Sequence, residues 1–453
     1  MTHIFREYDI RGIYKKDLTE DVVKNIGALL GKRISKVGKR VAVGYDARTH
    51  SPLITEWLMS GLNYAGLSVE NMGLVPTPCN YFAGFKDDKA DATVMITGSH
   101  NPPEYNGFKM TINQNPFFGE DITSLGKEVL KALKEKKQIP TNLAHIDVST
   151  LKDYVAFLSS HFAHLKDMKT PLVIDCGNGA AGEAVRAVCD TLSLNAKILY
   201  ETPDGTFPNH HPDPSEIENL RDIQNILEQD GAKLGFAFDG DADRLAVLTK
   251  ENNFKGDQLV LMYAKTLKNP RILGEVKCSQ VMYDEVAKIG KAYMYKTGHS
   301  NIKVKMKELN IDIAAEVSGH IFFADRYFGY DDAIYAMLRT LELVKDGMDL
   351  DLELEKLPHT YSTEELKIPT TEEEKFKTIE KLRSFLENPP SDFPPIRDII
   401  TVDGVRVVFE KGWGLIRASN TTPVLVARFE ATEEKEKRRY QDAMEKALKA
   451  CQC

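Results

Sequence analysis

The sequence is poor in cysteine and has no long apolar run. Its 453 residues include six cysteines, too few for the disulfide framework of a small secreted protein and without the paired C-x-x-C motifs of a zinc site. No apolar stretch approaches the ~18 residues of a membrane-spanning helix. The first residues, MTHIFREYDIRG, carry charges where a signal peptide needs an apolar segment. We therefore expect a reduced, cytoplasmic protein that does not bind membranes.

The sequence also lacks an excess of basic residues. It has 59 Lys and Arg against 67 Asp and Glu, for a formal net charge of −8. Nucleic-acid binding usually needs a basic surface, so we expect no nucleic-acid partner. The acidity does not exclude an anionic substrate, because a local cationic pocket can lie in an acidic protein.

Short apolar runs alternate with helical patterns over most of the chain. RVAVGYD precedes a helical pattern at residues 51–66, and PLVIDCGNGAAG precedes another at residues 183–194. This alternation predicts α/β layers with largely parallel sheets, whose sites lie where strands end in loops. Residues 401–431 instead alternate as antiparallel strands do, which predicts a smaller α+β unit at the C-terminus. Turn-rich breaks lie near residues 140–150, 250 and 360–365.

A cluster of acidic residues follows the apolar run LGFAF. Asp239, Asp241 and Asp243 alternate in DGDADR, and in an extended backbone their side chains would share one face. Three convergent carboxylates repel one another unless a cation lies among them, and oxygen ligands suit Mg²⁺ or Ca²⁺. A calcium EF-hand is disfavoured, because Arg244 stands where its glycine belongs and Lys250 where its glutamate belongs. A solvated acidic turn remains the alternative.

A serine follows a second apolar run, in ATVMITGSHNPPEYNGFKM. Ser99 lacks the G-x-S-x-G elbow of a hydrolase nucleophile, and it could simply cap the Asn101–Pro102 turn. The third interpretation is a phosphoryl carrier, because a phosphoserine brings acceptor oxygens that would join three carboxylates around Mg²⁺. The dipeptide Asn106–Gly107 predicts a tight hairpin turn that returns Lys109 to the side of Ser99.

Two further loops have the polar groups that a sugar phosphate needs. In AEVSGH, Glu316 has two acceptor oxygens for neighbouring hydroxyls, and Ser318 adds a donor and an acceptor. An ordinary strand-end turn is the alternative there. In IRASNTTP, Arg417 is followed by small residues whose backbone N–H groups could hold a phosphate. Small polar residues also make ordinary turns, which is the alternative for this loop.

Together these stretches resemble the α-D-phosphohexomutases, nearest to the bacterial phosphomannomutase/phosphoglucomutase group. FREYDIRG is similar to the N-terminal signature of that family, TGSHNPPEYNGFK to its phosphoserine loop and DGDADR to its metal loop. EVSGH is similar to its sugar-specificity loop and RASNTTP to its phosphate loop. Further similar segments are DCGNGAAG, FPNHHPDP, KTGHSNIK and FGYDDAIYA. The resemblance covers essentially the whole chain, with the motifs in the family's order.

The resemblance implies four domains around a central cleft, each contributing one loop. Three would be similar α/β domains with mixed sheets, and the C-terminal one a smaller α+β domain. We expect the phosphoserine loop in residues 1–147 and the metal loop in residues 148–250. The sugar loop would belong to residues 251–362 and the phosphate loop to residues 363–453.

The resemblance also implies roles for individual residues. Ser99 would carry the phosphoryl group, and its phosphate would bind Mg²⁺ together with Asp239, Asp241 and Asp243. The catalytic candidates are Lys109 and His320 for proton transfer, and Arg11, Arg244 and His100 near the phosphoryl group. The residues expected to bind substrate are Tyr8, Lys277, His299, Glu316, Ser318, Arg417, Ser419, Asn420 and Thr421.

The implied activity is an intramolecular phosphotransfer that interconverts hexose 1-phosphate and hexose 6-phosphate, of mannose or glucose. It would proceed through a phosphoserine enzyme and a hexose 1,6-bisphosphate. Ala315 and Val317 flank Glu316 where the bifunctional members usually have Gly and Met, so the preferred hexose stays open. A phosphoglucosamine mutase is one alternative, and a metal-dependent sugar phosphatase is a second from another class. We expect small hexose phosphates as the only partners, and a monomer.

Overall fold

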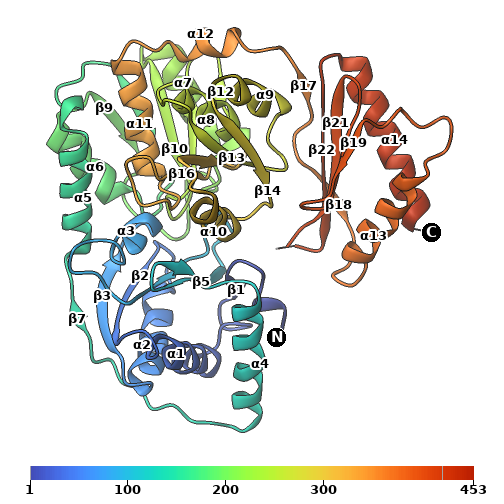
Figure 1. Cartoon of the computed structure of the whole chain (residues 1–453). Helices are drawn as coiled ribbons and strands as arrows, with labels where there is room; N and C mark the ends of the chain where they lie inside the picture. The colour runs from blue at the N-terminus through green and yellow to red at the C-terminus, as the bar shows by residue number, and fades with distance from the viewer. Residues whose placement is uncertain (1, 421, 453) are drawn as a thin grey trace.

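The computed structural model describes residues 2–420 and 422–452, which form four successive units with one sheet each. Figure 1 shows the first three units joined in one body and the C-terminal unit standing beside the third. The sheets of the first three units combine parallel and antiparallel strands, whereas the last sheet is antiparallel throughout. This confirms the predicted fold class, although the sheets are mixed rather than largely parallel.

The first unit is built on a seven-stranded sheet in the order β1-β5-β4-β2-β3-β7, with β6 paired to β5. Helical crossovers make β2, β3 and β4 parallel, and β5 returns antiparallel to β4. Acidic residues in the first turn of α1 and basic residues in its last turn complement the helix dipole. The elements are η1 (Thr2–Ile4), β1 (Ile10–Ile13), α1 (Glu20–Ile34), β2 (Arg40–Tyr45), α2 (Ser51–Tyr64), β3 (Ser68–Leu74), α3 (Thr77–Phe82), β4 (Ala92–Ile96), β5 (Tyr105–Ile112), β6 (Asn115–Pro116), α4 (Glu120–Lys134) and β7 (Ile146–Asp147).

The second unit has a five-stranded sheet in the order β12-β11-β10-β8-β9. β8, β9 and β10 are parallel, and β11 forms an antiparallel pair with β10, so that the metal loop connects two adjacent strands. Helix α7 buries Ile223 and Leu227, four residues apart on one face. The elements are α5 (Thr150–His161), η2 (Ala163–Leu165), β8 (Leu172–Asp175), α6 (Gly182–Leu192), β9 (Ala196–Leu199), η3 (Ile217–Leu220), α7 (Arg221–Gln229), β10 (Leu234–Phe238), β11 (Leu245–Leu248) and β12 (Asn253–Phe254).

The third unit has a four-stranded sheet in the order β14-β13-β15-β16. β13 is parallel to β14 and β15, so three loops leave the same edge of the sheet side by side. The Asp332 side chain accepts from Tyr335 N (2.8 Å) and thereby caps α11. The elements are α8 (Gly256–Ala264), β13 (Arg271–Glu275), α9 (Gln280–Ile289), β14 (Lys291–Tyr295), α10 (His299–Leu309), β15 (Ile313–Ala315), β16 (Ile321–Phe323), α11 (Ala333–Lys345) and α12 (Leu350–Glu355).

The C-terminal unit has a six-stranded sheet in the order β17-β22-β21-β20-β19, with β18 also paired to β22. Helix α14 buries Tyr440, Met444, Leu448 and Cys451, at the spacing of one helical face. The predicted antiparallel alternation of residues 401–431 is confirmed by β20–β22. The elements are β17 (Tyr361–Ser362), β18 (Leu366–Pro369), α13 (Glu374–Glu387), β19 (Asp398–Ile400), β20 (Val405–Val408), β21 (Gly412–Ala418), β22 (Val424–Ala431) and α14 (Glu434–Gln452).

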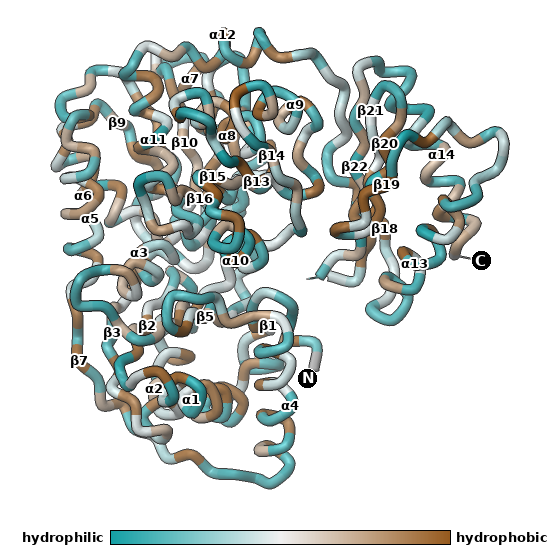
Figure 2. Tube along the Cα trace, in the orientation of Figure 1, coloured by the Kyte–Doolittle hydropathy of each residue, from teal (hydrophilic) through white to brown (hydrophobic). Residues whose placement is uncertain are grey.

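Apolar packing divides the molecule unequally. One continuous core joins the second and third units and includes Cys79, Phe82 and Met95 of the first, while the first unit has a further core of its own. The C-terminal unit packs a separate core between its sheet and its two helices. Figure 2 shows apolar segments along the strands and the inner helices of these layers. Apolar packing between the third unit and the last is small, a contact of Val276 with Trp413 and Leu415, and polar contacts such as that of Arg406 with Val276 O also join them.

Two further observations concern the predicted compartment. Within residues 2–420 and 422–452, no helix has both the length and the apolar character required to cross a bilayer. The five cysteines of the described part, Cys79, Cys176, Cys189, Cys278 and Cys451, are all buried free thiols.

Two local predictions are wrong. Asn106–Gly107 is not a hairpin turn but lies inside β5, paired with β1, because a Cβ at residue 107 would collide with the backbone oxygen of Ile10 and only glycine allows this approach. The chain reverses earlier, between β4 and β5, and Lys109 then lies opposite Met95. The metal loop is not extended either, since Ala242 has φ +60° and the chain turns there.

Candidate active site

One cleft of about 1260 Å³ is lined by segments from all four units. The cleft therefore combines loops that are up to four hundred residues apart in the chain, as a four-domain arrangement requires. Thr421, one of the predicted residues, lies outside the described part of the chain. The predicted residues that line the cleft are Tyr8, Arg11, Ser99, His100, Lys109, Arg244, Lys277, His299, Glu316, Ser318, His320, Arg417, Ser419 and Asn420.

Ser99 lies in the loop after β4 with its hydroxyl turned toward the second unit. Its backbone has φ +48°, a left-handed conformation that costs a non-glycine residue on the order of 1–3 kcal/mol. Ser99 N donates to Thr97 Oγ1 (2.7 Å), and Ser99 Oγ donates to Asp239 Oδ2 (2.9 Å). The loop must therefore be held from outside, and the serine is held next to the acidic cluster.

A buried arginine supplies that support. Arg48 is 1% exposed and donates to the backbone oxygens of Ser99 (2.8 Å), Asn101 (2.6 Å) and Pro102 (2.5 Å). Asp46 pairs with Arg48 Nε at 3.0 Å. The planar guanidinium donates to three carbonyls and to Asp46 at once, whereas a lysine ammonium has only three donors. Arg48 thus fixes the backbone that presents Ser99.

Cationic and neutral groups surround the Ser99 hydroxyl. Arg11 Nη1 donates to Gly98 O (2.6 Å), on the cleft side of the same loop. His100 Nδ1 lies 3.3 Å from Ser99 Oγ. Burial, together with the charges of Arg244 and Arg11, holds the pKa of His100 well below its ordinary value, so this imidazole is neutral. A group transferred at Ser99 would meet arginine charges and a neutral histidine.

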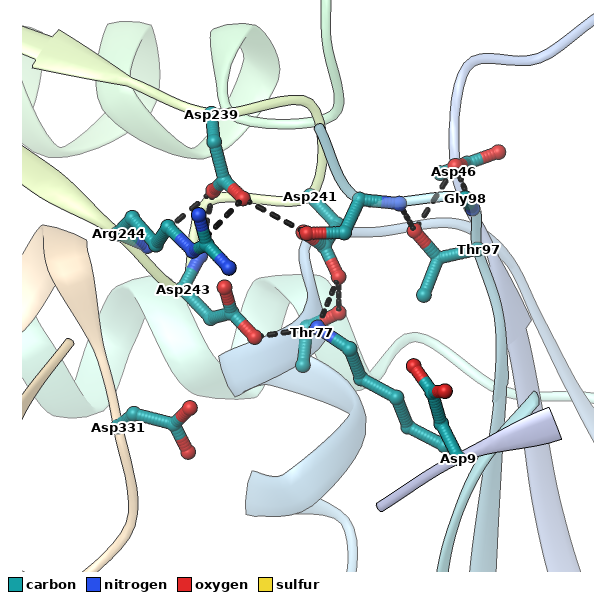
Figure 3. A network of polar contacts seen from close by, with 12 residues as sticks. Asp9, Asp46, Thr77, Thr97, Gly98, Asp239, Asp241, Asp243, Arg244 and Asp331 are labelled. Carbon is teal, nitrogen blue, oxygen red and sulfur yellow. Dashed lines mark hydrogen bonds and ion pairs between the residues drawn. The ribbon is translucent and has the colours of Figure 1, made fainter. Parts of the chain in front are cut away.

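The acidic cluster lies between β10 and β11. Asp239, Asp241 and Asp243 are fully buried, and one oxygen from each lies within 4.8 Å of the others. Figure 3 shows the three carboxylates gathered around a common space, with Thr77 beside Asp241. Thr77 Oγ1 donates to Asp241 Oδ2 at 2.6 Å, a contact between the first and second units. The three predicted carboxylates are therefore convergent, and the solvated turn considered from the sequence is wrong.

The three carboxylates of this cluster lie beside two cationic side chains, Lys109 and Arg244. Burial and the neighbouring carboxylates of Asp241 and Asp243 raise the pKa of Asp239 well above its usual range. Lys109 Nζ donates to Asp241 Oδ2 (2.6 Å) and to Asp243; burial opposes its charge, but these carboxylates raise the pKa of Lys109 above its ordinary value. Arg244 Nε is 4.0 Å from Asp239 Oδ2, and Asp241 Oδ1 and Asp243 Oδ1 are buried without a hydrogen-bond donor in the described chain. Such hard oxygen donors fit Mg²⁺.

His320 faces the same space from the third unit. Arg244 Nε donates to His320 Nε2 (2.9 Å), and His320 Nδ1 lies 2.9 Å from Asp331 Oδ2. The imidazole proton therefore belongs on Nδ1, and Nε2 is the acceptor. Lys303 Nζ in turn donates to Asp331 (3.0 Å). His299 stacks with His320 at 5.8 Å between ring centroids, so both predicted histidines of this unit lie together.

The sugar loop is tied to its neighbours on both sides of the cleft. Glu316 Oε1 accepts from Gly298 N, and Ser318 lines the cleft beside it. Tyr8, from the first unit, donates its hydroxyl to Thr297 O (2.7 Å). Burial raises the pKa of Tyr8 above its ordinary value, so the hydroxyl stays protonated. Groups from the first and third units therefore meet at this part of the cleft.

The phosphate loop connects β21 to β22 at the far side of the cleft. Arg417 Nε donates to Asp403 Oδ2 (2.8 Å), while Arg417 Nη2 is buried and has no hydrogen-bond acceptor within the described residues. Asn420 Nδ2 donates to the Tyr8 hydroxyl (2.5 Å), which links the C-terminal unit to the first. An arginine with one unused donor at a cleft wall is suited to an anion.

Comparisons with known proteins agree with this geometry. Four family models of the phosphoglucomutase/phosphomannomutase group match in order: alpha/beta/alpha domain I at residues 2–137, domain II at residues 152–253, domain III at residues 255–361 and the C-terminal domain at residues 365–447. A curated phosphomannomutase/phosphoglucomutase of Pseudomonas aeruginosa is 40% identical over 456 residues, covering 99% of this chain and 96% of that protein. The chain belongs to the phosphoglucomutase/phosphomannomutase family.

Other members of the phosphoglucomutase/phosphomannomutase family are similar over nearly their whole length. A phosphoglucomutase of Neisseria gonorrhoeae is 40% identical over 438 residues, or 94% of this chain and 93% of that one. A crystal structure of a family protein from Burkholderia thailandensis has a TM-score of 0.89 and 37% identity, and covers 100% of this chain and 98% of its own. The resemblance drawn from the motifs is thereby confirmed.

Sequence reasoning missed the buried groups that support the family's loops. Lys277 Nζ, for example, lies 2.5 Å from Glu365 and 3.4 Å from Glu275. No motif indicated either glutamate. Asp331 could have been found, because it lies in FGYDDAIYA, a segment similar to the family, but no role had been assigned to it. The missed residues are Asp46, Arg48, Glu275, Lys303, Asp331, Glu365 and Asp403.

Proposed function

We propose that the chain interconverts hexose 1-phosphates and hexose 6-phosphates of glucose and mannose, with Ser99 as phosphoryl carrier and a hexose 1,6-bisphosphate as intermediate. The observation that carries this proposal is the 2.9 Å contact of Ser99 Oγ with Asp239, because Ser99 lines a cleft that the phosphate loop also lines. A carrier next to a metal site and a second anion site in the same cleft are what a reversible transfer between two ends of one sugar needs.

Asp239, Asp241 and Asp243 would hold Mg²⁺ together with a phosphate oxygen on Ser99. When bound, the ion supplies charge neutralisation for the phosphoryl group. Arg11 and Arg244 add positive charge from the side of the cleft. Such charge matters because phosphoryl transfer depends on alignment and electrostatic stabilisation more than on covalent help from the protein.

The proton of the attacking sugar hydroxyl is best assigned to His320. Its Nε2 accepts from Arg244 and would take the proton once this lone pair is released from the Arg244 N–H, while Nδ1 stays directed at Asp331 and keeps the ring oriented. Lys109 is held as an ammonium by Asp241 and Asp243. Lys109 therefore serves as a positive charge, and it would become a proton donor only where a bound cation takes over these carboxylates; His320 serves as the base.

The C-terminal unit would bind the phosphate that does not react. Arg417 and the small residues after it would hold that phosphate. Glu316 would accept hydrogen bonds from ring hydroxyls, and Ser318 would accept or donate one. Binding energy from this distant group can fix the hydroxyl that faces Ser99. The bisphosphate intermediate then reverses its orientation in the cleft, so that its other phosphate faces Ser99 and returns a phosphoryl group to it. The hexose phosphates are the expected partners, and the enzyme is expected to act as a cytoplasmic monomer.

The two alternatives differ in products. A phosphoglucosamine mutase would share every step and accept an amino sugar, whereas a sugar phosphatase would release inorganic phosphate. The phosphate loop favours a mutase, because hydrolysis does not need a second anion site.

One set of assays tests the proposal. Glucose 1-phosphate, mannose 1-phosphate and glucosamine 1-phosphate are supplied side by side, and 6-phosphate products and inorganic phosphate are both measured. We expect 6-phosphates of glucose and mannose without inorganic phosphate, and activity several orders of magnitude lower in Ser99→Ala. Full mutase activity in Ser99→Ala, or inorganic phosphate as the sole product, would overturn it.

A further inference from the structure

Glu275 is the last residue of β13, the strand that lies between β14 and β15. All three strands are parallel, and Tyr295 is the register partner of Glu275 on β14. Lys277 and Glu316 lie in the loops that follow β13 and β15, His299 begins α10 after the loop that follows β14, and all three line the cleft. Glu275 therefore lies at the centre of the sheet edge from which the third unit's substrate-facing loops emerge.

The Glu275 side chain contacts each of these loops. Its Oε1 accepts from Val317 N at 3.0 Å, in the loop that carries Glu316. Its Oε2 accepts from Thr297 Oγ1, in the loop that leads to His299. Lys277 Nζ lies 3.4 Å from Oε1. Hence one carboxylate joins the three loops, through a backbone N–H, a hydroxyl and an ammonium.

Glu275 acts at one remove from the cleft. It is 0% exposed and does not line the cleft, so a ligand there cannot touch it. The segments that contain Lys277, Thr297 and Val317 lie between Glu275 and the cleft. The positions of these segments depend on the two carboxylate oxygens of Glu275. A carboxylate accepts hydrogen bonds in preferred directions. A change at Glu275 would therefore move the groups that contact the ligand without removing any of them.

The carboxylate is expensive to keep in this place. Burial raises the pKa of Glu275 to about 7, and the nearby charges of Glu316 and Glu365 add to that rise, whereas Lys277 and the hydrogen bond from Thr297 oppose it. A buried acid that only filled space could be replaced by an amide or an apolar residue at lower cost. Its contacts with three loops give a reason for its presence.

We propose that Glu275 is a positioning residue that sets the relative places of Lys277, the Thr297–His299 loop and the Glu316 loop, and thereby the discrimination between hexose phosphates. This inference rests on the proposed mutase function. The sugar hydroxyls are read by Glu316 and Ser318, and Glu275 determines where those groups stand relative to Lys277. Its effect should therefore fall on substrate binding and selectivity and leave the chemistry at Ser99 intact.

The test compares Glu275→Gln with the wild-type enzyme in steady state with glucose 1-phosphate and mannose 1-phosphate. Glutamine keeps the shape but replaces one acceptor oxygen with a donor. We expect KM to rise about tenfold or more, kcat to change far less, and the ratio of kcat/KM between the two sugars to shift. Asp312→Asn, at the opposite end of β13, where the side chain accepts from Arg271 N (2.8 Å), is the control and should keep that ratio.

A second variant guards against misfolding and measures coupling. Thr297→Val removes only the hydroxyl that donates a hydrogen bond to Glu275. It should raise KM by a smaller factor than Glu275→Gln does. In the Glu275→Gln background it should add little, because both changes break the same contact. The unfolding midpoint of each variant is measured beside the kinetics.

The outcomes separate the two levels of inference. A higher KM with a shifted sugar ratio and non-additive variants supports the role of Glu275. An active wild-type enzyme whose Glu275→Gln and Thr297→Val variants keep KM and the sugar ratio, or lose only kcat in proportion to the folded fraction, overturns it alone. A wild-type enzyme without mutase activity overturns the proposed function, and this inference with it.

Discussion

The first three units and the C-terminal unit differ in how they are held. The second and third units share one apolar core that reaches into the first, and Ser99, the three aspartates and His320 all lie around it. The C-terminal unit has a separate core and meets the third unit through a small apolar contact and a set of arginines. The groups proposed for the chemistry thus lie on the continuous body, and the group proposed to bind the distant phosphate lies on the separate one.

The difference teaches where precision is needed. Phosphoryl transfer requires groups held within fractions of an ångström, and a shared close-packed core can supply that. The site that binds the non-reacting phosphate has to release and rebind an intermediate that reverses its orientation. The polar contacts of the C-terminal unit can be broken and re-formed at a smaller cost in free energy than apolar packing. Changes in the joined body should therefore abolish the chemistry, and changes in the C-terminal unit should weaken binding.

The largest effect is expected in the joined body, at the acidic cluster. Asp241→Asn removes one of three charges that would balance Mg²⁺ and leaves Lys109 with one carboxylate fewer. Activity should fall by several orders of magnitude, and chelation of wild-type enzyme should do the same until Mg²⁺ is restored. Activity that survives exhaustive chelation would assign these carboxylates to structure alone.

A smaller effect is expected in the C-terminal unit, at Arg417. Arg417→Ala should raise KM strongly and lower kcat, because the distant phosphate also helps to orient the reacting hydroxyl. Loss of a charge-assisted hydrogen bond costs ~1.5–3 kcal/mol, roughly 10- to 200-fold in kcat/KM. Phosphorylation of Ser99 by a hexose bisphosphate should still occur at higher bisphosphate concentration, as intact mass will show. Wild-type kinetics in this variant would leave the C-terminal unit without a catalytic role.

The interface between the two regions should give a weaker effect still. Arg406 donates to the backbone oxygens of Val276 (2.6 Å) and Cys278 (2.9 Å) and stacks 3.8 Å from the Trp413 ring. Arg406→Lys keeps the charge but loses the fork and much of the stacking. We expect KM to rise roughly threefold to tenfold, with the rate of Ser99 phosphorylation at saturating bisphosphate unchanged. A fall in that saturated rate would mean that the two regions are not separate in function.

The smallest effect on turnover is expected from Asp332, a buried acid in the joined body. Its effect is measured as a change in the free energy of unfolding. Burial raises the pKa of Asp332 from 3.8 to about 6, so the folded state prefers the protonated acid. Its ionisation above about pH 6 costs the fold up to ~3 kcal/mol, and this cost disappears as the pH falls toward 4. Asp332→Asn cannot ionise, so its stability relative to wild type should be greater at pH 8 than at pH 4, by denaturant unfolding. A constant difference would contradict the shift.

Much of the fold and of the site could be predicted from the sequence. The alternation of apolar runs and helical patterns predicts α/β units, and the motifs indicate one family and, through it, Ser99, the aspartates, Glu316 and Arg417 as candidates. Asn106–Gly107 was misread, because a local turn preference yields to the pairing of β5 with β1. Glu275 and Arg48 could not be found, because their partners lie in other segments and only the folded chain brings them together.

The central claim is that Ser99 passes a phosphoryl group to and from a sugar. The direct measurement incubates the wild-type enzyme with glucose 1,6-bisphosphate whose phosphoryl oxygens carry a heavy-oxygen label, followed by intact mass and peptide mapping. The account predicts a single labelled phosphate on the peptide that contains Ser99. It also predicts that this label moves to added glucose 1-phosphate and re-forms the bisphosphate. A label on another residue, or one that leaves only as inorganic phosphate, would contradict the account.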